Sequence, residues 1–534
     1  MSSEPPGSEP GAPSVPLHER PEIHRRRWFL LGVMCLSLVL VVMGVSGLNV
    51  AIPSLQRGLD ATATDLQWIV DAYAIVFAGL LLSAGSLGDR FGRKRALLGG
   101  LAVFGGGAVL GALADTSTTL IVARVVMGVG AAFIMPSTLS MLSAIFPPHE
   151  RSRAIAVWAG FAGAGGALGP LIVGFLLTDW WVFPAYWWGA AFLVNLVAVV
   201  PVIVAIALWA PESRDDEVTP LDPLGAGLSL VGLSAMLFGI IEGPTKGWTD
   251  PAVLAGFVVG AIGLVGFVAW ERRAPHPMLP IGLFRRRGFS IGSGVITFAF
   301  FVMFGFFFLM TQYLQLVRGY SPLDAGVAAL PLALMLVLVS PRSAALTERF
   351  GIGTVIPTGF AVLVAGLVIM ALLGPDTPYI VFAAGLVLLG AGMGITVAPA
   401  TGSIMSSVPL NRAGIGSAVN DTTRELGGSL GIAVLGSIAT SVYRGQVDTS
   451  DLPPALAGPA SESVGAAVAV GQQVGGDVGE ALAASAGNAF TEAFNTTMAA
   501  GAVVGVLSAI AVAWAARRHN VPTVATDRPE AART

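Results

Sequence analysis

Long apolar runs separated by short polar stretches occupy most of this sequence. An α-helix needs about 20 apolar residues to cross a bilayer, and runs of that size recur fourteen times. Two long runs contain one proline each, Pro136 or Pro399, and we interpret each as a single kinked helix. The pattern predicts an all-α integral membrane protein with fourteen transmembrane helices, near residues 28–53, 69–88, 96–114, 118–146, 154–177, 186–210, 223–242, 252–270, 289–316, 325–347, 354–373, 379–406, 427–443 and 490–515.

The composition excludes several classes of protein. The chain is 54% hydrophobic and only 11% charged, which is too oily for the polar surface of a soluble enzyme. Its net charge of -3 gives no reason to expect nucleic-acid binding. The sequence lacks a nucleotide-binding loop and a hydrolase triad in context. We therefore expect neither an enzyme nor an ATP-driven pump, and no metal or cofactor.

The polar segments predict the topology. Residues 1–27 are rich in Pro, Ser and Glu and are expected to form a disordered cytoplasmic tail, with a second tail at 516–534. Most basic residues, Arg424 among them, fall at loops and helix ends of one side, whereas the other side holds only Arg57, Lys246, Arg318 and Arg444. Positively charged loops stay inside. This predicts a plasma-membrane protein with both termini in the cytoplasm.

One external segment is unusually long. Residues 444–489 are rich in Ala, Gly and Ser and carry an excess of acids. The composition favours a floppy acidic linker, and gating of cation access from outside is the alternative.

An internal repeat divides the chain. Leu87-Gly-Asp-Arg-Phe-Gly92 recurs as Leu346-Thr-Glu-Arg-Phe-Gly351, and the glycine pattern of 165–174 recurs at 427–436. The repeat predicts two six-helix bundles, 28–210 and 289–515, joined by a linker at 211–288 that carries two extra helices. Duplicated membrane halves are characteristic of secondary transporters, whose substrate site lies between the halves.

Two ionisable residues occur inside predicted helices of the first half only. Asp71 and Arg124 lie at similar depth, and their repeat counterparts are apolar. An ionisable side chain in a membrane helix is costly and is a functional candidate. A carboxylate beside a guanidinium can bind and release a proton as the pair separates, so we expect Asp71 and Arg124 to couple transport to protons. A fixed ion pair between the two helices is the alternative.

The motifs now support a comparison with a known family. The run Gly85-x-Leu-x-Asp89-Arg90-x-Gly92-Arg93 resembles the signature loop of the major facilitator superfamily. Arg124 with two following glycines resembles its fourth-helix motif, and Gly165, Gly169 and Pro170 resemble the fifth-helix motif of antiporters. With fourteen helices the chain is similar to the drug:proton antiporters of multidrug efflux. This resemblance implies the major facilitator fold, transport powered by the proton gradient, and a role for Arg124 in proton transfer.

One departure from that family concerns the first helix. Such antiporters carry a membrane aspartate there, where this chain has Gly44 in Met43-Gly-Val-Ser46. Coupling through the first helix is therefore weakened in this chain, and Asp71 takes a larger share of the proton-coupling role.

The signature loop has two interpretations. Its basic residues would hold any loop inside, but the acid and the glycines indicate a conformational latch, in which the acid pairs with a basic group or a helix end. We assign this latch to Gly85, Asp89, Arg90, Gly92 and Arg93, with Glu348 and Arg349 in the second copy.

Two further groups are candidate sites. Small residues at Gly165 and Gly169 permit close helix approach, and Pro170 favours a bend; ordinary tight packing is the alternative. The 289–316 run is rich in phenylalanine and suits an apolar pocket with a few polar handles. The substrate-binding candidates are Phe301, Phe304, Phe308 and Gln312.

Together these patterns predict a secondary transporter that exports small hydrophobic or cationic compounds in exchange for protons. Its partners would be the small-molecule substrate, protons and the lipid bilayer, with no nucleic acid, and it would work as a monomer. An exporter of an endogenous metabolite or lipid with weak or no proton coupling is the alternative, followed by a membrane sensor that does not transport.

Overall fold

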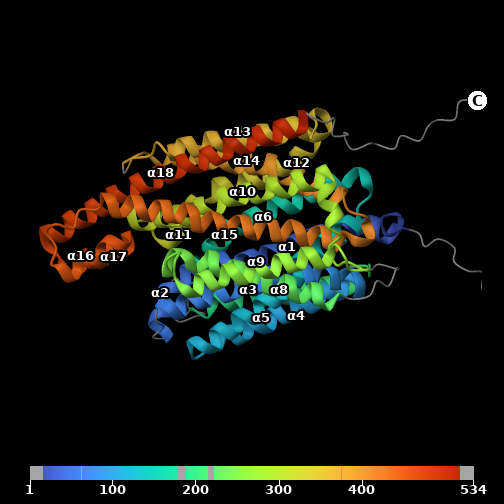
Figure 1. The fold of residues 1–534 in the computed structure, drawn as a ribbon, viewed down its shortest axis with the longest axis horizontal. Coiled ribbons are helices and arrows are strands. Elements are labelled where there is room, and N and C mark those ends of the chain that lie inside the picture. The colour runs from blue at the N-terminus through green and yellow to red at the C-terminus, as the bar shows by residue number, and fades with distance from the viewer. Residues whose placement is uncertain are drawn as a thin grey trace, which may run out of the picture.

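Helices form nearly the whole described part of the chain. The computed structural model describes residues 16–59, 61, 63–176, 188–213, 222–374 and 376–517 (Figure 1). The outer parts of both predicted tails, before residue 16 and after residue 517, lie outside these residues. Within the described ranges the secondary structure is helical, without strands.

The first half of the chain contributes seven α-helices, and a helix pair follows. The seven are α1 (Pro21–Ser46), α2 (Leu48–Leu59), α3 (Ala63–Phe91), α4 (Arg93–Ala112), α5 (Ser117–Ile145), α6 (Pro148–Leu176) and α7 (Ala190–Trp209). The pair consists of α8 (Pro223–Lys246) and α9 (Pro251–Glu271).

The second half begins with the phenylalanine-rich helix. Its helices are α10 (Arg287–Gln312), α11 (Pro322–Ala328), α12 (Leu330–Phe350), α13 (Ile352–Met370), α14 (Tyr379–Ser406), α15 (Ala413–Gln446), α16 (Pro454–Glu462), α17 (Val464–Val474) and α18 (Gly476–Arg517). A short turn of helix, η4 (Leu410–Arg412), directly precedes α15.

The number of spanning helices agrees with the sequence. Among the described residues 13 helices are long and apolar enough to cross a membrane, or 14 when the bent α6 is counted as one span. As predicted, Pro136 and Pro399 each lie inside one continuous helix. Helix α6 bends by 43° between Gly166 and Leu168. Pro170 accounts for this position, because it has no N–H to bond the carbonyl four residues earlier.

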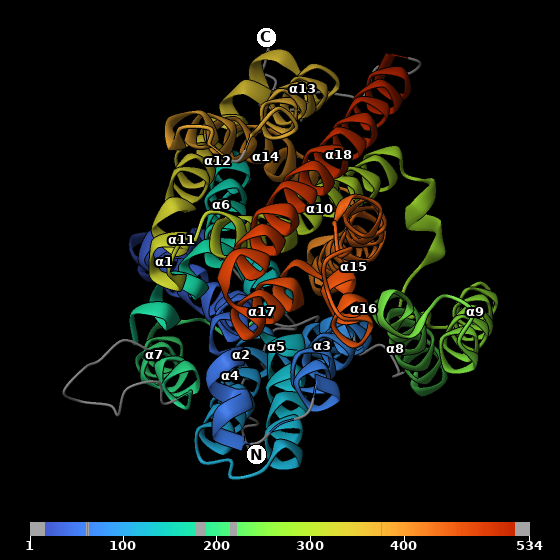
Figure 2. The ribbon, with the colours of Figure 1, turned by 90° about the vertical axis from the view of Figure 1, so that its left-hand side faces the viewer.

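The helices gather into two groups with the extra pair on one flank. Figure 2 shows α3, α4, α5 and α7 on one side and α10, α12, α13, α14 and α18 on the other, with α8 and α9 outside. Two sets of contacts join the groups: α6 packs on α12 and α14, and α15 packs on α3 and α5. The extra pair packs against α3 and α15. The first turn of α1 and the last turn of α18 lie at the same end of the molecule (Figure 1).

Two segments expected to be disordered are helical. Residues 21–27, which the composition places in the first tail, form the start of α1. The segment 444–489 is not a floppy linker: it contains the end of α15, the whole of α16 and α17, and the start of α18. Its many alanines have the highest helix propensity, and Ala460, Val464 and Ala467 are buried. The Tyr443 hydroxyl donates to the carbonyl of Ala460 at 3.1 Å and ties this end of α15 to the hairpin.

Candidate functional site

Asp89, in the last turn of α3, is seated on the N-terminus of α15. Its Oδ1 accepts from the backbone N–H of Gly414 at 3.0 Å, and its Oδ2 accepts from that of Ile415 at 3.3 Å. The N–H groups that begin a helix have no partner within the helix and carry a partial positive charge, which favours a carboxylate. Asp89 therefore joins the two halves of the chain at this end of the molecule.

Arg93 completes this connection from the first turn of α4. Its Nε donates to Oδ1 of Asp89 at 2.9 Å, and its Nη2 donates to the carbonyls of Leu410 at 2.7 Å and Asn411 at 3.3 Å. The side chain is buried. We call the contacts of Asp89 and Arg93 with residues 410–415 the Asp89 latch.

Gly85 and Gly92 allow this geometry. A Cβ on Gly85 would lie 2.5 Å from the carbonyl oxygen of Gly414, so α3 and α15 touch where only glycine fits. Gly92 has a φ of 110°, a conformation that glycine adopts without a steric cost. Arg90 lies over the ring of Phe91, with 5.3 Å from its Cζ to the ring centroid.

The second copy of the motif makes no such connection. Glu348 and Arg349 are both exposed at the end of α12. Arg349 lies over the neighbouring Phe350 ring at 5.1 Å, and no hydrogen bond or ion pair of Glu348 occurs among the described residues. The repeat thus preserves the helix end and its positive-φ glycine, Gly351, without bringing Glu348 and Arg349 to the other half.

Arg124 is fully buried in α5 and is held by backbone carbonyls. Its Nε donates to the carbonyl of Ile69 and its Nη1 to that of Gly44, both at 2.8 Å. The guanidinium lies 4.3 Å from the ring centroid of Tyr73, and its Nη2 has no hydrogen-bond partner among the described residues. Arg124 therefore binds the backbone of α1 at Gly44.

Asp71 lies on α3, the helix whose Ile69 carbonyl accepts a hydrogen bond from Arg124. The residue is 9% exposed and lies two positions after Ile69, about half a helical turn along α3. The structure therefore places Asp71 and Arg124 in one region of the first half.

Gly165 and Gly169 of α6 pack against α1. A Cβ on Gly165 would lie 3.0 Å from the Cβ of Val42, and one on Gly169 would overlap the hydroxyl of Ser46. The Ser46 hydroxyl donates to the carbonyl of Gly165 at 3.4 Å. Pro170 lies at the wall of a cavity. These small residues thus bring α6 against α1 beside the cavity.

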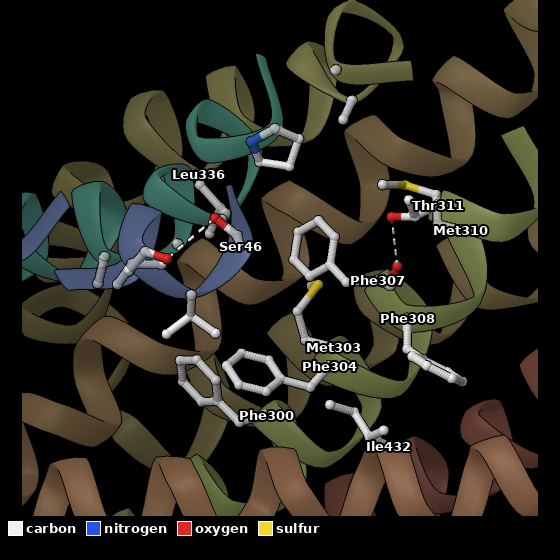
Figure 3. Close-up of a pocket in the computed structure, with 18 of the residues that line it drawn as sticks. Ser46, Phe300, Met303, Phe304, Phe307, Phe308, Met310, Thr311, Leu336 and Ile432 are labelled. Atoms are coloured by element: carbon white, nitrogen blue, oxygen red, sulfur yellow. Dashed lines mark hydrogen bonds between the residues drawn. The ribbon is translucent and has the colours of Figure 1, made fainter. Parts of the chain in front are cut away.

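That cavity, of about 500 Å³, lies between the halves and is lined mainly by apolar side chains from α1, α6, α10, α12 and α15. Figure 3 shows Phe304 and Phe307 of α10 projecting toward Ser46 of α1, with Ile432 of α15 on the wall. Three of the predicted substrate-binding residues line it: Phe304, Phe308 and Gln312. Phe301 lies elsewhere on α10, where its carbonyl packs against Gly431.

A charged group that was not predicted from the sequence lies in the wall of the same cavity. Arg424, which the charge pattern assigns to the cytoplasmic side, is instead 4% exposed in the interior of α15, with Asp421 and Glu425 beside it. The predicted span began at residue 427 because the preceding residues are polar, whereas the helix begins at Ala413. We call Asp421, Arg424 and Glu425 the α15 charge cluster. The small residues at 413–418 indicate that this helix begins well before residue 427.

The sequence profile of the Major Facilitator Superfamily matches residues 34–432. The chain belongs to this family. It is 35% identical to the multidrug efflux pump LfrA of Mycolicibacterium smegmatis over 92% of the chain and 97% of that protein. It is 31% identical to the methyl viologen resistance protein SmvA of Salmonella typhimurium over 87% of the chain and 93% of that protein. The chain is thus a multi-pass membrane transporter and not an enzyme.

A solved structure supports the fold. A bacterial homologue of the human lysosomal transporter Spinster, in an inward-facing and unoccupied conformation, superposes with a TM-score of 0.56. The match covers 93% of this chain and 98% of the other at 20% identity. The architecture predicted from the apolar runs and the repeat, the major facilitator fold, is therefore confirmed.

Proposed function

We propose that the chain is a plasma-membrane exporter of small hydrophobic or cationic compounds, including drugs, that exchanges them for protons. It would act as a monomer with both termini in the cytoplasm. The observation that carries this proposal is the cavity between the halves, which combines an aromatic wall on α10 with the charged residues Arg424 and Glu425 on α15.

The lining of the cavity suits substrates of this class. Phenylalanine rings exclude water and also attract cations through their faces, while Thr311 and Gln312 supply polar groups. A volume of about 500 Å³ lies within the range of pockets for drug-sized molecules. Apolar aromatic cations therefore fit the lining better than sugars or amino acids, which need many hydrogen bonds.

The names of the relatives agree with this class. LfrA is a multidrug efflux pump and SmvA confers resistance to methyl viologen, which is an aromatic dication. Proton coupling is supported by the buried Arg124 and by the nearby Asp71, because buried ionisable groups in membrane helices are typical of proton pathways.

Everted membrane vesicles test the proposal. With a pH gradient across the membrane, vesicles that contain the protein should accumulate the fluorescent cation ethidium, and accumulation should stop when an ionophore dissipates the gradient. Vesicles from cells without the protein are the control. Accumulation that continues at the same rate after the gradient has collapsed would indicate the uncoupled alternative.

Asp71→Asn tests the coupling residue itself. The variant removes the charge and keeps the shape, so we expect it to abolish gradient-driven accumulation while the protein still inserts in the membrane. Glu462→Gln, at the end of α16, is the matched control and should retain full activity. Undiminished coupling in Asp71→Asn would remove this residue from the mechanism.

A further inference from the structure

The α15 charge cluster places two carboxylates and one guanidinium within five consecutive residues of a membrane helix. We propose that this cluster is the exchange site of the transporter, where a proton and the cationic group of a substrate compete for one negative charge. The inference rests on the proposed function and specifies the residues at which the exchange takes place.

The position of the cluster follows from the helix period. Gly414 and Ala418 contact Gly85 of α3, so this face of α15 points to the first half. Residues three to four apart share a helix face, and Asp421 and Glu425 continue the same row. Phe77 of α3 and Glu425 line one cavity. The cluster therefore lies at the boundary between the halves, where a change of conformation alters its surroundings.

Asp421 and Arg424 are buried, Glu425 is partly exposed, and polar atoms of the two buried residues are incompletely paired. Asp421 is 0% exposed, and it receives one hydrogen bond, at 3.1 Å from the amide of Asn420 to Oδ1. Oδ2 of Asp421 and Nε of Arg424 have no hydrogen-bond partner among the described residues. Buried polar groups are normally paired, so the unpaired Nε of Arg424, which lines the cavity, and the unpaired Oδ2 of Asp421 one turn away indicate a place for a ligand.

The surroundings of Arg424 point to a cation as that ligand. Its guanidinium lies 4.7 Å from the ring centroid of Phe300, and Glu425 and Asp421 are one and three positions away on the same helix. One guanidinium balances one of two carboxylates, which leaves one negative charge. In a water-poor site that charge must be neutralised, and the cavity beside it admits a proton or an organic cation.

The ionisable groups on the helices that pack against α15 do not change the charge balance of the cluster. The ring of Tyr73 of α3 lies 4.3 Å from the Arg124 guanidinium, and its phenol carries no charge. Arg124 adds one positive charge, and Asp71 on α3 adds one negative charge when it is ionised. Asp89 and Arg93 form a separate ion pair at 2.8 Å. The ionisable groups around the cavity therefore keep a net negative charge, which one proton or one cationic group neutralises.

Exchange at this site needs no reagent beyond water. With a proton bound, the carboxyl O–H neutralises the cluster. As an organic cation enters the cavity, that O–H bond breaks, the proton passes to water, and the carboxylate forms an ion contact with the cation. We assign this contact to Glu425, because it lines the cavity, and a counter-charge role to Asp421.

Proton release on binding tests the proposal without any variant. The purified full chain in detergent is mixed with ethidium in weakly buffered solution that contains a pH indicator. We expect one proton to be released for each ethidium bound, and ethidium affinity to weaken by about tenfold for each pH unit on the acid side. Ethidium binding without proton release overturns the proposal.

Isosteric variants test whether the released proton comes from the α15 charge cluster. Glu425→Gln and Asp421→Asn should each lose proton release and bind ethidium about tenfold more weakly, while the neutral dye Nile red binds as before. Glu425→Asp should retain release, and Glu492→Gln, an exposed carboxylate on α18, is the matched control. Wild-type release in Glu425→Gln overturns the assignment even if vesicle transport remains coupled to protons. Loss of coupled transport in the wild-type protein would instead refute the proposed function.

Discussion

Replacing Asp89 by asparagine should release the Asp89 latch and change how often this end of the molecule opens. Asparagine keeps one acceptor oxygen, but its amide group presents N–H where the carboxylate accepts from a backbone N–H. The variant loses the charge that faces both Arg93 and the N-terminus of α15, and at least one of three hydrogen bonds, which now measure 2.9, 3.0 and 3.3 Å.

The structure allows a rough magnitude. A hydrogen bond to a charged group contributes about 1.5–3 kcal/mol, and a carboxylate at a partly buried helix N-terminus contributes about 1 kcal/mol. The loss is therefore about 3 kcal/mol of the closed state, since Asp89 is only 5% exposed and water screens it little. At about 1.4 kcal/mol for each factor of ten, the open fraction should rise by up to about 100-fold.

Alkylation of a buried cysteine measures this opening. Ser417, one turn beyond the latch, is fully buried and its hydroxyl has no hydrogen-bond partner among the described residues, so Ser417→Cys is a mild change. In a background with Cys35→Ser, a water-soluble maleimide should react up to about 100-fold faster when Asp89→Asn is added. Coupled export should fall while membrane insertion is unchanged.

Arg95→Gln is the matched control from the same segment. Arg95 is largely exposed and lies 3.5 Å from Glu212, and a surface ion pair of this kind contributes less than about 1 kcal/mol. Its effect on the alkylation rate should be less than about fivefold. An unchanged rate in Asp89→Asn would refute the latch and return the loop to a purely topological role.

Three other changes have defined outcomes. Gly44→Asp places a carboxylate at the α1 position that Arg124 already contacts, with Phe104 at 3.3 Å and Met127 at 3.7 Å from the new Cβ; proton-driven vesicle transport should become stronger, and no change would exclude α1 from coupling. Gly169→Ala should destabilise the protein by about 1–3 kcal/mol through overpacking on α1, measured as earlier thermal unfolding than in Gly32→Ala, where a Cβ meets open space. Phe304→Ala should weaken Nile red binding by about tenfold and Phe301→Ala should not, because only Phe304 lines the cavity; equal losses would contradict the pocket.

The spanning helices could be predicted because membrane burial imposes a simple length and composition. The run containing Pro399 remains one helix, since neighbouring helices satisfy the backbone around a proline. The same criterion of length and composition did not predict where α15 begins. Asp421 and Arg424 face protein and not lipid, so hydropathy placed them outside the membrane although they are buried.

The partners of the site residues could not be predicted from the sequence. Asp89 binds N–H groups more than three hundred residues further along the chain, and Arg124 binds the carbonyl of Gly44, a contact that the Gly44 side chain does not encode. The prediction for the segment 444–489 was wrong for another reason. Its richness in Ala, Gly and Ser and its excess of acids favoured a floppy acidic linker, whereas alanine favours helices whenever a neighbouring helix covers one face.

The continuity of α15 has a consequence for regulation. Gly414, which receives Asp89, and Glu425, which lines the cavity, are separated by three helical turns of one unbroken helix, or about 16 Å along its axis. A rigid rod that carries both groups cannot move one without the other. By thermodynamic reciprocity, the closure of the latch must then change the proton affinity at Glu425 by the same factor as protonation of Glu425 changes closure. The helix would thus couple the Asp89 latch allosterically to the exchange site at Glu425.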